Sequence, residues 1–193
     1  MSYEELSTPG GGRLGTPASR EIFRVNETDP ETAQGATDSD WLLRPGAISY
    51  RGVIFPWDCD AMGHLNNKHY FGLFDQAAWH LFLALGFRPV AAARTGLGLA
   101  DVNQNISFKR EVLAGQLIVI RSYLERVGTK SLTARHEMFD AENGEPVAQL
   151  LSVTAFFDLQ LRRATPIPTQ IRAAAQGWLD VQQQAAALQA AGS

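Results

Sequence analysis

Residues 57–70 of this chain are Trp-Asp-Cys-Asp-Ala-Met-Gly-His-Leu-Asn-Asn-Lys-His-Tyr. They lie between a strand-like stretch and a helix that is apolar on nearly every side. The first N–H groups of a helix lack partners within the helix, and the helix dipole favours negative charge beside them. Two acids, a histidine and two asparagines at such a place predict a site that acts on a carbonyl group, because its oxygen becomes an anion during attack.

The sequence after this stretch predicts one long central helix. Residues 70–85 carry apolar side chains around almost the whole circumference, and Gly86 supplies a stop signal. A helix that is apolar on all sides is normally buried, and the remaining sequence offers mainly strands to bury it. We therefore expect an α+β fold, with one strongly curved antiparallel sheet wrapped around this helix.

Strand patterns separated by turn signals supply that sheet. The expected strands are residues 48–55, 97–108, 117–126, 131–139 and 147–159. Asn143-Gly144 is a hairpin signal between the last two. A surface helix is expected over residues 169–190, with an apolar stripe made by Ile171, Trp178, Val181, Ala185 and Leu188. The free edge of such a sheet can be covered by pairing with a second copy, so we expect at least a homodimer.

The pattern Asp-x-Asp-x-x-Gly-His-x-Asn-Asn-x-x-Tyr, from Asp58 to Tyr70, resembles the hotdog-fold acyl-CoA thioesterases of the hydroxybenzoyl-CoA thioesterase type. The resemblance covers roughly Gly46 to Pro166. It implies that Asp60 is the catalytic carboxylate, which attacks the thioester carbon or activates water. It also implies that the backbone N–H of Asn67 binds the thioester oxygen, at an active site on a dimer interface where the coenzyme A arm runs along the partner subunit.

Other residues are expected to support this site. His64 and Asn66 are expected to position it, His64 by orienting Asp60, and Tyr70 is expected to contact the substrate. Four residues are candidates for the phosphates of coenzyme A: Lys109, Arg110, Lys130 and Ser131. Neither a metal nor a redox cofactor is expected, and coenzyme A enters as part of the substrate.

Each acid also has an alternative interpretation. Asp60 could instead form an Asx turn or a helix cap, although two acids followed by Gly-His would be unusual for capping alone, and Asp58 could belong to a turn or to a two-carboxylate site. Asp75, inside the central helix, is a rival catalytic acid, because another branch of hotdog thioesterases carries its carboxylate there. A metal site built from Asp58, Asp60, His64 and His69 is a further rival, although the spacing matches no standard metal motif.

The hypothesis is therefore an acyl-CoA thioesterase, which converts a thioester and water into a carboxylic acid and free coenzyme A. The alternative is a hotdog domain without catalytic activity that binds acyl groups or an acyl carrier protein. The acyl chain and the choice between a homodimer and a dimer of dimers stay open at this stage.

The composition argues against several other classes of protein. A net charge of −3 over 193 residues gives no basic footprint for nucleic acid, and no apolar run is long enough to span a membrane. The single cysteine, Cys59, excludes an internal disulfide. The lack of a visible secretory signal favours a cytoplasmic location.

Three regions are expected along the chain. Residues 1–45 are rich in Gly, Pro, Ser, Thr and acids, and they predict a disordered or loosely docked arm. Within it, the apolar island Trp41-Leu42-Leu43 is a candidate for docking on the domain or on a partner subunit. Residues 46–166 are expected to form the hotdog thioesterase domain, and residues 167–193 a C-terminal helical extension.

Overall fold

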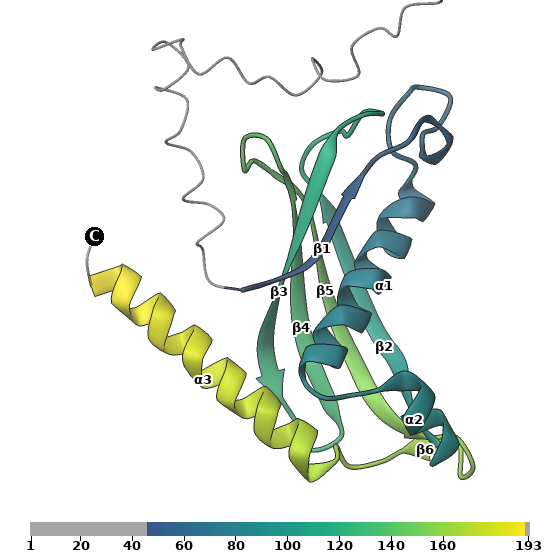
Figure 1. Cartoon of the computed structure of the whole chain (residues 1–193), viewed down its shortest axis with the longest axis vertical. Coiled ribbons are helices and arrows are strands. Elements are labelled where there is room, and N and C mark those ends of the chain that lie inside the picture. Colours follow the sequence, from purple (N-terminus) through teal and green to yellow (C-terminus); the bar gives the residue numbers. More distant parts are fainter. Residues whose placement is uncertain (1–45, 192–193) are drawn as a thin grey trace, which may run out of the picture. The chain divides into compact units, whose positions relative to one another are not determined.

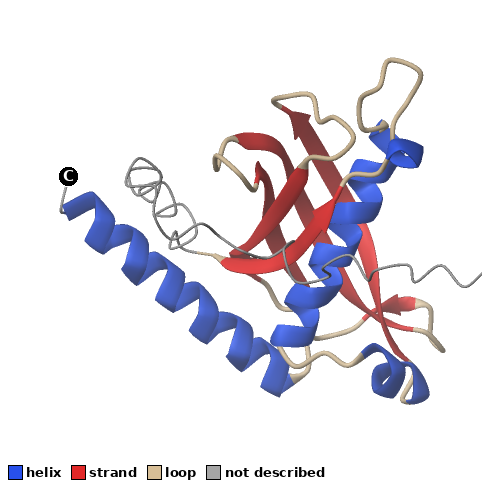
Figure 2. Ribbon diagram, turned by 45° about the horizontal axis from the view of Figure 1, so that its top comes forward, coloured by secondary structure: helices blue, strands red, loops and turns tan. Residues whose placement is uncertain are grey.

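The computed structural model describes residues 46–191, apart from the side chain of residue 189. The predicted N-terminal arm, with Trp41-Leu42-Leu43, lies outside the described residues. Figure 1 shows the described part as a single curved sheet with α1 against one of its faces. Figure 2 shows the same arrangement by secondary structure, with helix α3 beside the sheet.

The sheet is antiparallel throughout, in the order β1-β3-β4-β5-β2, with the short β6 paired to β5. Its strands are β1 (Ala47–Val53), β2 (Leu97–Phe108), β3 (Leu117–Val127), β4 (Ser131–Asp140), β5 (Pro146–Asp158) and β6 (Arg163–Ala164). The helices are α1 (Asn67–Ala84), α2 (Pro89–Arg94) and α3 (Thr169–Ala191), with a 3-10 turn, η3 (Pro56–Asp58), before the motif. The expected α+β arrangement of one curved antiparallel sheet around a central helix is confirmed.

Helix α1 is buried on one side only. Its sheet-facing side chains pack into the core, and they are Tyr70, Phe74, Ala77, Leu81 and Phe82. On its other side Phe71 and Trp79 are each 41% exposed. The prediction of a helix enclosed on all sides is therefore wrong for the single chain. The sheet curves around one side of the helix, and the other side keeps an apolar face that no other element among residues 46–191 covers fully.

A row of polar side chains crosses the core side of the sheet. Ser49, Ser122 and His136 come from β1, β3 and β4, and each is buried. The Ser122 hydroxyl lies 2.6 Å from both the Ser49 hydroxyl and Nδ1 of His136. On the other side, Nε2 of His136 lies 3.4 Å from the hydroxyl of Ser152 on β5. Burial lowers the pKa of His136 from 6.5 to about 4, so its ring is neutral at physiological pH.

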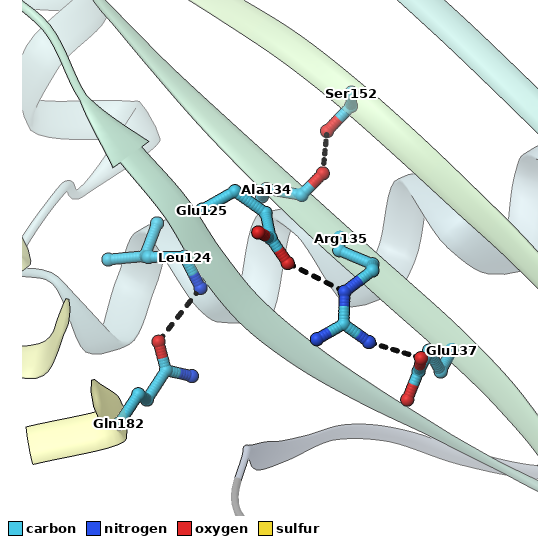
Figure 3. A network of polar contacts seen from close by, with 7 residues as sticks. All are labelled: Leu124, Glu125, Ala134, Arg135, Glu137, Ser152 and Gln182. Atoms are coloured by element: carbon cyan, nitrogen blue, oxygen red, sulfur yellow. Dashed lines mark hydrogen bonds and ion pairs between the residues drawn. The ribbon is translucent and has the colours of Figure 1, made fainter. Parts of the chain in front are cut away.

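Helix α3 covers the end of β3 that β1 does not reach. Pairing between β1 and β3 ends at Ser122, so the next part of β3 has an open edge. There the N–H of Leu124 donates to Oε1 of Gln182 on α3 at 3.0 Å (Figure 3). Figure 3 also shows Arg135 of β4 bonded to Glu125 and Glu137. A side chain from α3 thus supplies the partner that a neighbouring strand would otherwise provide.

The predicted apolar stripe of α3 is only partly correct. Ile171 is buried as expected, but Leu188 is 76% exposed and Val181 is exposed as well. Ala175, which is not part of the predicted stripe, is fully buried instead, because it packs with Ile171 in a core cluster that includes residues of β3, β4 and β5. The start of α3 is therefore part of the hydrophobic core.

Strand β2 forms the other edge of the sheet. It is 12 residues long and pairs only with β5 among the described strands. Val102, at a bulge in the middle of β2, is exposed. A long edge with an exposed apolar residue is a typical place for pairing with another chain.

Candidate active site

The motif folds into a tight loop between η3 and α1. Cys59 and Leu65 form an isolated antiparallel bridge at its base. The N–H of Asp60 donates to the carbonyl of His64 at 2.8 Å, and the N–H of Gly63 donates to the carbonyl of Asp60 at 3.0 Å. Gly63 has φ +84°, a conformation that other residues adopt at a cost, so a glycine here allows the turn. The loop brings the acid and the histidine of the motif to the same side of the helix start.

Asp60 has its side chain fixed by this loop. Its Oδ1 accepts the N–H of Met62 at 2.8 Å and the N–H of His64 at 3.3 Å. This is the Asx turn that the sequence offered as an alternative to catalysis. The two interpretations are compatible, because both bonds use Oδ1 and none of the described residues bonds to Oδ2.

The start of α1 presents one backbone donor without a partner. Asn66 is the N-cap residue, and its side-chain oxygen accepts the N–H of Lys68 at 3.1 Å. The carbonyl of Asn66 accepts the N–H of His69 at 2.9 Å. Between them, the N–H of Asn67 meets no acceptor in the part of the chain that the structure describes. It is therefore available to an oxyanion, with the helix dipole behind it.

The segment after β2 closes the site from the other side. The N–H of Leu65 donates to the carbonyl of Val112 at 2.7 Å, and His64 forms a backbone bridge with Leu113. As a result, Nε2 of His64 lies 3.3 Å from Oε2 of Glu111. Glu111 is exposed, so this pair orients the imidazole more than it stabilises the fold.

Together these elements line an open cavity of about 330 Å³. Asp60, His64, Asn67 and Tyr70, which the sequence placed in one site, all line it. Burial raises the pKa of Tyr70, and the charge of Glu111 raises it further, so the phenol remains protonated. The remaining lining residues are Met62, Leu65, Phe108, Lys109, Arg110 and Glu111.

Two larger grooves lie elsewhere. One, of about 470 Å³, is lined by α2 and the start of α3. The other, of about 490 Å³, is lined by β1 and β3. The motif cavity is the candidate active site despite its smaller volume, because it combines a carboxylate, a histidine and a free helix N–H.

Asp58 does not belong to the cavity. The sequence allowed a two-carboxylate site if residues 58 and 60 shared a strand, but Asp58 ends η3 instead. Its Oδ2 accepts the N–H of Phe55 at 3.0 Å, and its Oδ1 lies 3.8 Å from Nδ1 of His69. Asp58 therefore holds the entry to the motif loop, as its alternative interpretation predicted.

Asp75 lies away from the motif cavity. It lines a separate small cavity of about 60 Å³ between α1 and the strands β2 and β5. There Asp101 accepts the hydroxyl of Thr154 at 2.6 Å. Asp60 lies in the loop before α1, whereas Asp75 lies within α1. The two candidate catalytic acids therefore line different cavities.

Lys130 and Ser131 lie at the far end of the sheet from Asp60. Ser131 pairs with Ala155 of β5, whereas Phe108 beside the cavity pairs with Ala148. Seven residues of extended strand separate these positions, which corresponds to about 23 Å. Within one chain, Lys130 and Ser131 are therefore not brought to the cavity, whereas the other two phosphate candidates, Lys109 and Arg110, line it.

The described residues include neither a cluster arranged as metal ligands nor a membrane-spanning helix. Among residues 46–191 no group of three or more His, Cys, Asp or Glu side chains is arranged to hold a metal ion. No helix in that range is long and apolar enough to cross a membrane.

The chain belongs to the thioesterase-like superfamily, whose sequence profile matches residues 54–175. This match covers the motif loop, strands β2 to β6 and the start of α3. A comparison with curated protein sequences gives no significant match.

Solved structures share the fold at low sequence identity. A hypothetical protein from Staphylococcus aureus in complex with CoA superposes with TM-score 0.66 and 11% identity, covering 70% of this chain and 86% of that one. A 1,4-dihydroxy-2-naphthoyl-CoA thioesterase from Synechocystis gives TM-score 0.61 and 15% identity, covering 67% and 95%. A gentisyl-coenzyme A thioesterase gives TM-score 0.60 and 23% identity, covering 65% and 98%.

Proposed function

We propose that this protein hydrolyses an acyl-CoA thioester to a carboxylic acid and free coenzyme A. One observation carries the proposal: the Asp60 carboxylate and the unpartnered N–H of Asn67 line the same cavity. The carboxylate supplies a nucleophile or general base, and the helix start supplies an oxyanion donor. These are the two elements that acyl transfer needs.

The reaction is a substitution at the thioester carbon. Asp60 either attacks this carbon, giving an anhydride that water then hydrolyses, or takes a proton from a water molecule that attacks directly. In both cases the carbonyl oxygen gains negative charge next to the N–H of Asn67. The C–S bond then breaks, and the coenzyme A thiolate takes up a proton. His64, held by Glu111 at 3.3 Å, positions the cavity wall beside Asp60.

The solved structures of the same fold support a CoA thioester as the substrate class. One was solved in complex with CoA, and two are thioesterases for gentisyl-coenzyme A and 1,4-dihydroxy-2-naphthoyl-CoA. The cavity wall of this chain contains Tyr70 and Phe108, whose rings meet edge to face at 5.0 Å. An aromatic acyl group would find a suitable apolar surface there.

The active form in this proposal is a homodimer joined along β2, either alone or as half of a dimer of dimers. Two features support it, the open edge of β2 and the uncovered apolar side of α1. In an antiparallel β2 pair, the end of one β2 at Phe108 lies near the start of the other at Leu97. The start of β2 is at the same end of the sheet as Ser131. This pairing would bring Lys130 and Ser131 of the partner subunit toward the cavity.

The direct test is the release of free thiol from short, long and aromatic acyl-CoAs by the purified protein. Turnover that depends on the acyl group would support the proposal and begin to define the pocket. No turnover with any acyl-CoA, together with binding of acyl groups or of an acyl carrier protein, would favour the non-catalytic alternative.

Lys130→Ala is expected to raise the KM for acyl-CoA at least about tenfold with little change in kcat, because a charged contact to a phosphate contributes about 1.5–3 kcal/mol. Steady-state kinetics would measure this. The matched control is the same acyl group on pantetheine, which lacks the nucleotide phosphates. Wild type and Lys130→Ala should have equal KM values for it. A loss of the same size on both substrates would contradict the phosphate role.

A further inference from the structure

The outer face of the sheet, opposite α1, carries a buried apolar patch on β3 and β4. Val119 and Phe139 are each 4% exposed, and Ile48 and Ala141 pack against them. Val119 lies between Ile118 and Ile120, which point into the α1 core, so its own side chain points to the other face. Helix α3 contacts β3 near Leu124, at the other end of the strand. Ile48, Val119, Phe139 and Ala141 make up an apolar patch on the outer face of the sheet.

A groove of about 490 Å³ continues this patch toward the β1 edge. Its lining residues are Arg51, Gly52, Val53, Leu117, Ile118, Val119 and Ala141. Most of these are apolar, and the one charged side chain among them, Arg51, is exposed. The groove therefore offers an apolar floor with a cation beside it.

The chain enters the described structure on this same face. Arg121 is 1% exposed, and its Nη1 donates to the carbonyl of Gly46 at 2.8 Å. Gly46 also lies close to the ring of Tyr123, so that a Cβ on residue 46 would be 2.5 Å from Cε1 of that ring. Arg121 and Tyr123 have the same strand parity as Val119, so both point to the outer face. The described structure therefore begins on the face of the sheet that carries the patch.

Length and charge fit these preceding residues as the cover. Along β3, Val119 is about 7 Å and Leu117 about 14 Å from Arg121. The five residues 41–45 span up to about 17 Å when extended, which is enough to reach the groove. Asp38 and Asp40 precede Trp41 and would approach the Arg51 cation.

We infer that residues 38–45 fold back across the outer face of β1 and β3, and that Trp41 occupies the groove beside Val119. The occupant is a segment of the same chain, and the contact makes the first part of the sequence an element of the domain. This inference is independent of the proposed catalytic activity, because neither the groove nor the segment touches the Asp60 cavity.

Trp41→Ala in the full chain is expected to lower Tm by roughly 5–10 °C, since it removes a large buried aromatic side chain. Cleavage before Asp40 by an aspartate-specific endoproteinase should become at least about tenfold faster. Trp41→Phe should retain most of the wild-type Tm. The matched control Phe23→Ala, at the other aromatic residue of residues 20–45, should change neither Tm nor cleavage before Asp40.

A double-mutant cycle then assigns the partner of Trp41. Val119→Ala should lower Tm by itself but add little in the Trp41→Ala background, since both remove the same contact. Fully additive losses, or unchanged Tm and cleavage in Trp41→Ala, would overturn the inference. The inference would also be overturned if Val119→Lys had a lower molar mass by light scattering while Trp41→Ala left Tm unchanged, because a second copy would then cover this face.

Discussion

Asp60→Asn is expected to lower kcat for acyl-CoA hydrolysis at least about 10³-fold, with little change in KM. The substitution removes the charge and the basicity that the reaction needs. It keeps an oxygen that can accept the N–H groups of Met62 and His64, which now bond to Oδ1 of Asp60. The loop should therefore fold as in the wild type, and its Tm should confirm this. Thiol release under single-turnover conditions would measure the chemical step.

Asp58→Asn is the matched control for this experiment. It makes the same chemical change two residues earlier in the motif, at a carboxylate that accepts the N–H of Phe55 and does not line the cavity. We expect kcat to fall less than about tenfold, because an amide oxygen can still accept that bond. Equal losses in the two variants would show that the loop as a whole, and not the Asp60 carboxylate, sustains activity. Unchanged turnover in Asp60→Asn would exclude the mechanism.

The elements of the fold were predictable because their signals are local. Alternating strands and turn residues gave β2 with its observed bounds, Leu97–Phe108, and the other long strands within a few residues. The start of α1 was placed three residues late, at Tyr70, since the cap by Asn66 was not used to set the boundary. The short α2 and η3 were not predicted, because a helix of one or two turns has too little periodicity to detect.

The motif side of the cavity was predictable, but the contact between Glu111 and His64 was not. Asp60, His64, Asn67 and Tyr70 lie within one short segment, so their proximity follows from the turn. Glu111 reaches His64 only because the segment after β2 bridges the motif loop at Leu113. That contact depends on the register between segments distant in sequence, and no pattern in the chain encodes it.

The exposure of apolar residues was the main error, and it has one cause. Helical periodicity shows which residues share a face but not how much of the helix other elements cover. On α1 the sheet reaches only one side, and on α3 the core contacts only the first turns. Phe71, Trp79 and Leu188 are therefore exposed in the single chain. On α1 this open side lies next to the β2 edge that the proposed dimer uses.

Acid is expected to destabilise the fold through His136. Its pKa is about 4 in the folded protein because burial disfavours the charged ring, against 6.5 ordinarily. Above pH 6.5 the ring is neutral in both states, and no penalty arises. As pH falls from 6.5 to 4, the unfolded chain binds a proton that the folded chain does not. This difference should remove about 3 kcal/mol of the free energy of unfolding between pH 7 and pH 4 and then level off.

His136→Gln separates this contribution from that of the carboxylates. The variant should be less stable at pH 7, since glutamine only partly replaces the bonds to Ser122 and Ser152. Its free energy of unfolding can be measured by urea titration at each pH. Between pH 6.5 and pH 4 this free energy should fall by about 3 kcal/mol less than in the wild type. His80→Gln, at an exposed histidine of α1, should keep the wild-type dependence. The same pH dependence in wild type and His136→Gln would mean that the ring is protonated, or reached by water, inside the folded sheet, and that the polar row tolerates charge.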